Sequence, residues 1–363
     1  QGKVGFANSD SGGVSGGMPD YIDALDTQVV SWSDTQIVVE VPSAGGTGKI
    51  RVTHDDTSTV ESNTDLTITY AQLNIETDVG AGMQAFETQH YADNDGSGTF
   101  SGGYTWEMQT DFFDDSEQPG AKAAFLRAFE NWRCETKINW EVSATATTVD
   151  VIGVDTTDPA DGVLEADGVN VIRFDNSNEL PSGVLGRCTS WFSGRLCSGE
   201  VLLWVTDLDI VFDDGASWYF GSGGIVDGEF DFETVALHEL GHGHQLGHVI
   251  NTNNVMHYSV TDEEINIILD ANSIAAANNV QTRSTGTQVC GVPVIPLMTD
   301  YAGTCTLEVE DLNMEDSVAL YPNPTKKQFF IENSSSVKLE RVEIFDVSGR
   351  LISDIDVSNT SSV

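Results

Sequence analysis

The stretch that decides the fold is HELGHGHQLGH, at residues 238–248. It places His238 and His242 four positions apart, which on an α-helix puts both imidazoles on one face, one turn apart, within reach of one metal ion. Glu239 lies beside them as a candidate base. Five of the seven histidines of the chain fall between residues 238 and 257. This concentration indicates a metal centre.

A third metal ligand must come from beyond this helix, because a catalytic zinc site uses three protein ligands and leaves a fourth position open. We expect His248, since the six residues after His242 allow the chain to leave the helix, turn and bring an imidazole back. His244 is a poor substitute, because two further helical positions rotate it about 200° away from His242. We expect His244 to face outward or to support the site from behind, and His257 is a weaker candidate ligand.

The segment from His238 to His248, followed by Met256 and Tyr258, resembles the metzincin clan of zinc endopeptidases, which includes the matrixins. The Met-x-Tyr order is closest to the astacin and serralysin branches of the clan. The resemblance implies that Met256 lies in a tight turn beneath the three-histidine site. It also implies that Tyr258 can bind zinc and swing away to stabilise the oxyanion, the alternative being an ordinary core tyrosine.

The chain departs from the clan at Gln245, where the family has a glycine with positive φ. A non-glycine residue in that conformation costs roughly 1 kcal/mol or more, so either Gln245 tolerates it or a neighbouring glycine, Gly243 or Gly247, makes the turn. This departure leaves a second candidate for the third ligand, an acidic residue supplied by another helix as in the gluzincin clan: Glu263 or Glu264. We prefer His248 because Met256 and Tyr258 then have a function.

The chemistry follows from the ligands. Three neutral imidazoles leave zinc dipositive, so that a water on the metal becomes acidic, and Glu239 can accept its proton as general base and pass it to the leaving amine. We therefore predict a secreted zinc-dependent endopeptidase that hydrolyses protein or peptide substrates. The alternative is an adhesin or binding protein with an inactive metallopeptidase domain, for which Gln245 would be the sign of decay. A structural zinc site is a third reading and predicts four protein ligands.

Composition excludes several other functions. The chain has 363 residues, enough for two or three domains, with 57 acidic and 16 basic residues and a net charge of −41. Such a charge repels polyphosphates, so nucleic-acid binding is not expected. The apolar stretch at residues 289–298 is short and contains two prolines, so no insertion into a membrane is expected. We expect a monomer.

The first 72 residues read as a β-sandwich. Short alternating strands are separated by turns rich in Gly, Ser and Asp, and are expected at residues 29–32, 36–41, 49–54 and 65–70. The run from Ser31 to Val52 resembles the second half of an IPT/TIG immunoglobulin-like domain. The resemblance implies an accessory or spacer role for residues 1–72.

Residues 73–310 read as the catalytic domain. An apolar stripe at positions 125, 128, 129 and 132 predicts a helix over residues 120–134. Asp231 is placed to cap a second helix through the N–H groups of Glu233 or Thr234. Thr261 with Glu264 forms a capping box for a third helix over residues 265–277. Strands are expected at residues 104–113, 137–142, 149–154, 169–174 and 200–212. The expected fold is an α+β metzincin-like domain with a twisted mixed β-sheet and three main helices, flanked by β-sandwich modules.

Residues 311–363 read as a β-module that is cut short. Strands are expected at residues 328–332, at 339–345 and from Leu351 onward, and three strands with open edges are not stable alone. The segments YPNP at residues 321–324 and DVSGRL at residues 346–351 resemble the C-terminal sorting tails of type IX secretion cargo. The resemblance implies export by that secretion machinery to the outside or surface of a bacterium.

Two further features concern cysteines and calcium. The close spacing of Cys188 with Cys197, and of Cys290 with Cys305, predicts two disulfides and leaves Cys134 over, the alternative being five reduced, buried thiols. The stretch DNDGS at residues 93–97 is typical of the start of a calcium loop, but position twelve is Tyr104, where an EF-hand needs a bidentate Glu. We read it as an acidic turn, with calcium as the alternative.

Overall fold

The structure is a computed structural model of the chain. It describes four long stretches and several short ones, with gaps between them. These are residues 2–92, 102–150, 166–176, 179–197, 199–221, 224–286, 295–305, 318–321, 330–333, 341–345 and 351–356.

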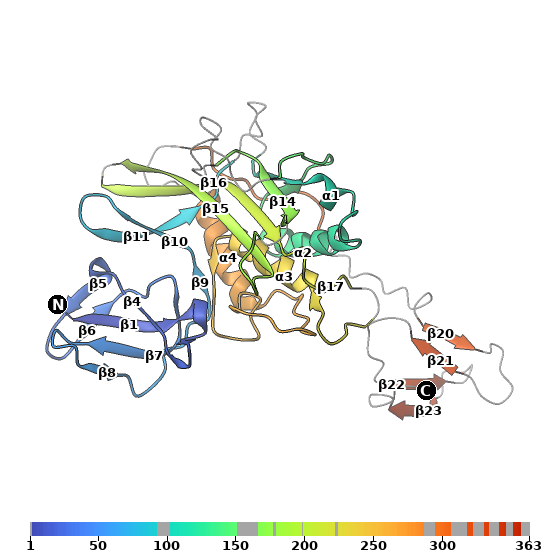
Figure 1. The fold of residues 1–363 in the computed structure, drawn as a ribbon, viewed down its shortest axis with the longest axis horizontal. Coiled ribbons are helices and arrows are strands. Elements are labelled where there is room, and N and C mark those ends of the chain that lie inside the picture. Colours follow the sequence, from blue (N-terminus) through green and yellow to red (C-terminus); the bar gives the residue numbers. More distant parts are fainter. Residues whose placement is uncertain are drawn as a thin grey trace.

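A seven-stranded mixed sheet lies along the upper side of the molecule in the view of Figure 1. Its strands are β10 (Asn74–Asp78), β11 (Met83–Gln89), β12 (Tyr104–Met108), β13 (Trp140–Val142), β14 (Asn170–Phe174), β15 (Gly186–Cys197) and β16 (Glu200–Phe212). Their order is β10-β11-β16-β14-β12-β13, and β15 pairs with β16. The pairs from β11 to β13 along this path are parallel, whereas β10 and β15 run antiparallel to their neighbours.

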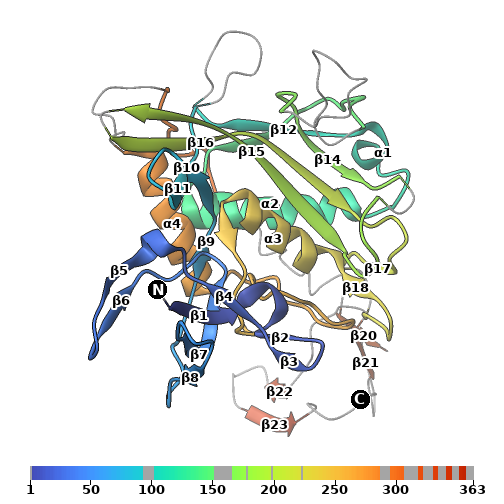
Figure 2. The same ribbon diagram turned by 60° about the vertical axis from the view of Figure 1, so that its left-hand side comes forward.

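Three main helices pack beneath this sheet (Figure 2). They are α2 (Ala121–Thr136), α3 (Phe232–Gly243) and α4 (Ala271–Thr285), and α1 (Thr110–Phe113) adds a single turn. The predicted stripe on α2 is the core face, since Phe125, Phe129 and Trp132 are at most 1% exposed. Burial of each such side chain contributes roughly 2–3 kcal/mol. The expected α+β fold with a mixed sheet is confirmed.

The predicted third helix starts in the wrong place. Thr261 and Glu264 do contact each other, because the Thr261 N–H and hydroxyl both donate to Oε2 of Glu264, at 3.1 and 3.2 Å. No helix follows, since Glu263 has φ +60°. The helix begins instead at Ala271, where Oδ1 of Asp270 accepts the N–H groups of the first turn at 3.0 Å.

We call residues 2–70 the N-terminal module. It contains a four-stranded sheet ordered β4-β1-β7-β8 and two small hairpins, β2-β3 and β5-β6. The strands are β1 (Lys3–Asn8), β2 (Val14–Ser15), β3 (Met18–Pro19), β4 (Tyr21–Asp23), β5 (Val29–Trp32), β6 (Ile37–Val39), β7 (Gly45–Thr53) and β8 (Thr59–Glu61), with the 3₁₀ turns η1 (Ser9–Ser11) and η2 (Asp26–Gln28). The strand expected at residues 65–70 is absent apart from one bridge between Leu66 and Gly48. The β-sandwich and the IPT/TIG resemblance stay predictions.

Short strands complete the described parts of the chain. They are β9 (Ala71–Gln72), β17 (Trp218–Tyr219), β18 (Phe230–Asp231), β19 (Leu246–Gly247), β20 (Val318–Tyr321), β21 (Phe330–Asn333), β22 (Arg341–Phe345) and β23 (Leu351–Asp356). The last four form two hairpins, β20-β21 and β22-β23. The strand predicted at residues 149–154 lies largely outside the described residues.

One predicted disulfide is wrong. Cys188 and Cys197 stand at opposite ends of β15, so about 30 Å of extended chain separates their Cα atoms, whereas a disulfide needs about 4–7 Å. Cys188 is a free thiol, as are Cys134 and Cys305. The second predicted pair joins Cys305, which is a free thiol, to Cys290, which lies outside the described residues.

Candidate active site

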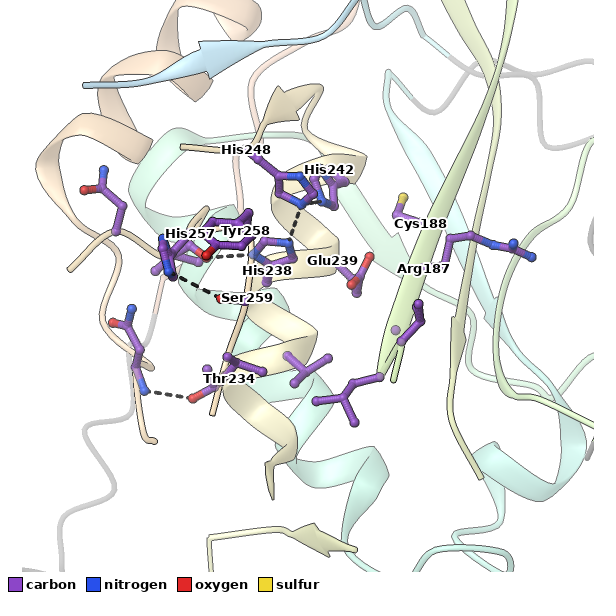
Figure 3. Close-up of a pocket in the computed structure, with 18 of the residues that line it drawn as sticks. Arg187, Cys188, Thr234, His238, Glu239, His242, His248, His257, Tyr258 and Ser259 are labelled. Atoms are coloured by element: carbon purple, nitrogen blue, oxygen red, sulfur yellow. Dashed lines mark hydrogen bonds between the residues drawn. The ribbon is translucent and has the colours of Figure 1, made fainter. Parts of the chain in front are cut away.

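Helix α3 carries the first residues of the site. Asp231 caps it as predicted, since its Oδ1 accepts the Thr234 N–H at 2.7 Å and the Thr234 hydroxyl at 2.6 Å. The apolar face of the helix, including Leu237 and Leu240, is fully buried. This packing fixes the rotation of the helix, so that His238 and His242 project together from the opposite side (Figure 3).

Gln245 makes the turn that ends this helix. Its φ is +67°, whereas neither Gly243 nor Gly247 has a positive φ, so the non-glycine residue itself adopts the left-handed conformation. Its fully buried amide is held on both sides, because Oε1 accepts from the Thr88 hydroxyl at 3.2 Å and Nε2 donates to Ser190 Oγ at 3.2 Å. The chain then runs through β19, which pairs antiparallel with β9. This pairing directs His248 back toward the helix.

The three histidines converge as the sequence predicts. Nε2 of His248 lies 3.3 Å from Nε2 of His238 and 3.1 Å from Nε2 of His242. In a tetrahedral site with Zn–N distances of about 2.0–2.1 Å, neighbouring nitrogens are about 3.3–3.4 Å apart. The spacing of the three atoms therefore fits a zinc ion.

The Nδ1 atoms of the three histidines show which ring nitrogen carries the hydrogen. Nδ1 of His238 lies 2.8 Å from the carbonyl oxygen of Val255, and Nδ1 of His242 lies 2.9 Å from that of Leu246. Nδ1 of His248 lies 2.8 Å from Oδ1 of Asp10. Since each of these oxygens can only accept, each Nδ1 carries the hydrogen and each Nε2 presents a lone pair. Three lone pairs facing one another call for a cation between them.

The protonation of these histidines favours metal binding. Burial, together with the neighbouring imidazoles, lowers the pKa of His238 well below its usual value and lowers the pKa of His242 to about 4. Both rings are therefore neutral at pH 7, which is the form that binds a metal.

Glu239 points away from the imidazoles toward β15, beside Arg187 and Cys188 (Figure 3). The Cys188 N–H hydrogen-bonds the carboxylate, while the buried Oε2 has no hydrogen-bond partner among the described residues. Burial raises the pKa of Glu239 to about 8, against smaller opposing effects of the Cys188 N–H and Arg187. Gly186 is required here, because a methyl group on it would lie 2.8–3.1 Å from the Glu239 side chain.

Met256 is buried against helix α3. It is 2% exposed, and a methyl group at Gly241 would overlap its sulfur, so helix α3 and the methionine approach closely. The residue before it, Val255, supplies the carbonyl oxygen that holds His238. The segment that contains Met256 thus holds His238 through a main-chain oxygen.

The remaining candidates lie elsewhere. Tyr258 lines the cavity in front of the triad, and its hydroxyl abuts Gly12. His257 is near Val249 O, at 3.3 Å, and it is not part of the cluster formed by the triad. Neither Glu263 nor Glu264 belongs to a metal-ligating cluster among the described residues.

The expectation that His244 faces outward is wrong. Its ring is fully buried on the far side of the helix, where Nε2 contacts Thr136 Oγ1 at 3.0 Å and the ring packs between Trp132 and Trp140. The rotation along the helix does carry His244 away from His242, but that side of the helix is the protein core. The calcium candidate at residues 93–97 lies outside the described residues.

The site opens into a cavity of about 470 Å³. Its walls include the triad and Glu239, the segment of residues 183–188 at the start of β15, and residues 254, 255 and 257–260. Two parts of the site, β15 and Asp10, are not predicted from the sequence. Nothing in the local sequence marks either as part of the site, because both reach it through long-range pairing.

Comparison with known families agrees with this geometry. Residues 201–280 match the family model described as Matrixin, which covers α3, the triad and the methionine. The chain contains a matrixin domain. Residues 319–363 match a second model, described as Secretion system C-terminal sorting domain. No curated protein matches the chain.

These matches carry consequences for function. Matrixins belong to the metzincin clan and bind a catalytic zinc, which suggests a metallopeptidase acting on protein substrates. The sorting domain makes this a secreted or cell-surface bacterial protein that engages the type IX secretion machinery. Among the helices of the described residues, none is long and apolar enough to cross a membrane.

Proposed function

We propose that the chain is a secreted zinc-dependent endopeptidase in which His238, His242 and His248 bind zinc and Glu239 is the general base. One observation carries the proposal. Three Nε2 lone pairs converge at zinc-ligand spacing beside a buried carboxylate oxygen that has no hydrogen-bond partner among the described residues. A purely structural zinc site would have four protein ligands, and the cluster contains three among the described residues.

The residues of the chain divide the work. A zinc ion held by the triad supplies Lewis acidity, which polarises a peptide carbonyl and lowers the pKa of water. Glu239 Oε2 accepts a proton from water in the cavity and later donates it to the departing amine. The Cys188 N–H keeps the Glu239 carboxylate oriented while it does so. Tyr258 is proposed to donate a hydrogen bond from its hydroxyl to the developing oxyanion.

We also propose the division of labour along the chain. Residues 1–72 form an accessory immunoglobulin-like module, residues 73–310 the peptidase and residues 311–363 the sorting module. The peptidase is proposed to act as a monomer.

The experiment compares the wild type with Glu239→Gln and Glu239→Ala. Both variants should bind one zinc per chain, and both should cleave an unstructured protein substrate at least 10²-fold more slowly, because the general base is lost. The glutamine is nearly isosteric and so preserves the packing against Gly186. Zinc content is measured by metal analysis, and cleavage by the appearance of new amino termini.

Two outcomes would overturn the proposal. Zinc bound by a wild type that cleaves nothing, after removal of any propeptide, would favour the alternative of an inactive adhesin. Undiminished cleavage by Glu239→Gln would remove Glu239 from the mechanism.

A further inference from the structure

His248 differs from the other two histidines in the hydrogen-bond acceptor of its Nδ1. Nδ1 of His238 and of His242 donate to main-chain carbonyls of the central region, whereas Nδ1 of His248 donates to a side chain, the carboxylate of Asp10, at 2.8 Å. Asp10 belongs to the N-terminal module, 238 positions earlier in the chain. We propose that Asp10 positions His248 for zinc binding, so that the N-terminal module is part of the metal site. This inference rests on the proposed function.

The N-terminal module holds Asp10 in place by its own hydrogen bonds. The Asp10 N–H donates to Oδ1 of Asn8 at 3.1 Å, and Asn8 caps the η1 turn. Ser9, which is fully buried, donates from its N–H and its hydroxyl to the carbonyl of Ala44, at 2.9 and 3.0 Å. The position of the Asp10 main chain is therefore set before it meets His248.

The N-terminal module is also seated closely on the segment that follows His248. A methyl group at Gly12 would overlap the ring and hydroxyl of Tyr258, and one at Gly46 would lie 2.6 Å from the Ile250 side chain. On the same segment, Nδ2 of Asn254 donates to the carbonyl of Thr69 at 3.3 Å. These contacts flank the pair of Asp10 and His248, so the approach of the carboxylate is part of a larger interface.

A carboxylate on the far nitrogen of a metal-binding histidine has two effects. It fixes the tautomer with the lone pair on Nε2, and it makes that nitrogen a stronger ligand. Removal of such a partner weakens metal binding by about 10–100-fold. Asp10 is 60% exposed, and solvent screens its charge, so we expect the low end of this range, about tenfold.

The test uses the full chain with Asp10→Ala, Asp10→Asn and Asp34→Ala. Asp34 is the matched control, because it is an exposed aspartate of the same module whose side chain makes no hydrogen bond to a described residue. Zinc affinity is measured by competition with a chromophoric chelator at fixed pH. Asp10→Ala should bind zinc about tenfold more weakly and Asp34→Ala as the wild type does. Asp10→Asn should lie between them, since its amide oxygen still accepts from Nδ1 but carries no charge.

Thermal unfolding of the metal-free chain distinguishes positioning from simple stabilisation. Loss of the Asp10–His248 contact, which is largely exposed, should lower the midpoint of Asp10→Ala by no more than about 3 °C relative to Asp34→Ala. Equal zinc affinities in these two variants would overturn the inference, as would a loss of affinity accompanied by a much larger drop in the midpoint of the metal-free Asp10→Ala chain. Faster cleavage by Asp10→Ala with unchanged zinc affinity would also overturn it, because the contact would then be inhibitory. A wild type that binds zinc without cleaving would overturn the proposed endopeptidase and leave the role of Asp10 intact.

Discussion

At the scale of single residues, Gln245 replaces the glycine that the metzincin clan has in this turn, and the three histidines still converge. The left-handed turn costs about 1 kcal/mol for a residue with a Cβ atom. The side chain offsets this cost through hydrogen bonds, of which the shorter ones are to Thr88, Ser190 and the Gly243 carbonyl. Gln245 is therefore built into the turn, and it gives no support to the reading of a decayed enzyme.

We expect Gln245→Gly to destabilise the fold, although glycine suits the backbone better. The gain of about 1 kcal/mol from relieved strain is smaller than the loss of three hydrogen bonds at about 1 kcal/mol each. Gln245→Ala loses the bonds without the gain, so the expected order of stability is wild type, glycine variant, alanine variant. Urea unfolding of the metal-free chain measures it. A glycine variant more stable than the wild type would show that the side-chain bonds contribute little.

At the scale of elements, helix α4 and the methionine turn are joined by one carboxylate. Asp270 caps α4 and also accepts from Asn254 Nδ2 at 2.9 Å and from the Val255 N–H at 3.1 Å. Val255 in turn holds His238 through its carbonyl oxygen. The start of a helix remote from the triad in sequence is thus coupled to a histidine of the site.

Asp270→Ala should therefore cost more than the loss of a cap alone. A helix cap is worth about 0.5–2 kcal/mol, and hydrogen bonds to a charged group contribute about 1.5–3 kcal/mol each, so we expect a loss of about 3 kcal/mol or more. Zinc binding should weaken as well. Asp231→Ala is the control, because it removes the cap of α3 and leaves residues 254–256 untouched; we expect about 1–2 kcal/mol for it. Chemical denaturation and chelator competition give the two readouts, and equal losses in both variants would contradict the coupling.

At the scale of the whole molecule, a buried aromatic cluster with an unusual polar member supports the site from behind. His90 is fully buried, its ring contacts those of Tyr104, Trp140 and His244, and neither ring nitrogen has a hydrogen-bond partner among the described residues. Burial lowers the pKa of His90 well below its usual value, and the nearby His244 and Arg283 add to the effect. The folded chain therefore keeps His90 neutral in mild acid.

This cluster predicts a dependence of stability on pH. In the unfolded chain His90 takes up a proton below about pH 6.5, whereas in the folded chain it stays neutral. The free energy of unfolding is therefore at its full value above pH 6.5 and decreases as the pH falls below it. His90→Phe removes this proton and sacrifices no hydrogen bond of the ring. The variant should match the wild type within about 1 kcal/mol at pH 7.5 and gain about 1.4 kcal/mol relative to it at pH 5.5. Urea unfolding in the presence of a chelator measures both values, and an unchanged difference between the two pH values would contradict the assignment.

Local signals predicted the elements that depend on short-range order. The cap at Asp231, the stripe on α2 and the spacing of His238 and His242 all act within a few turns of a helix, and the structure bears them out. The capping box at Thr261 misled, because the side-chain contact forms without a helix behind it. The predicted disulfide between Cys188 and Cys197 is wrong for a related reason. The two residues lie on one extended strand, whereas a turn between them would have brought them together.

The sequence alone predicted the histidine triad, the candidate base and the route of export, because these depend on a few residues close together in the chain or on a short tail motif. Only the tertiary structure decided how the site is held. Oε2 of Glu239, which has no hydrogen-bond partner among the described residues, is buried beside β15, and Nδ1 of His248 donates to Asp10 near the other end of the chain. Contacts between residues so far apart depend on how modules and strands pack, and packing leaves no local pattern from which such a partner can be read.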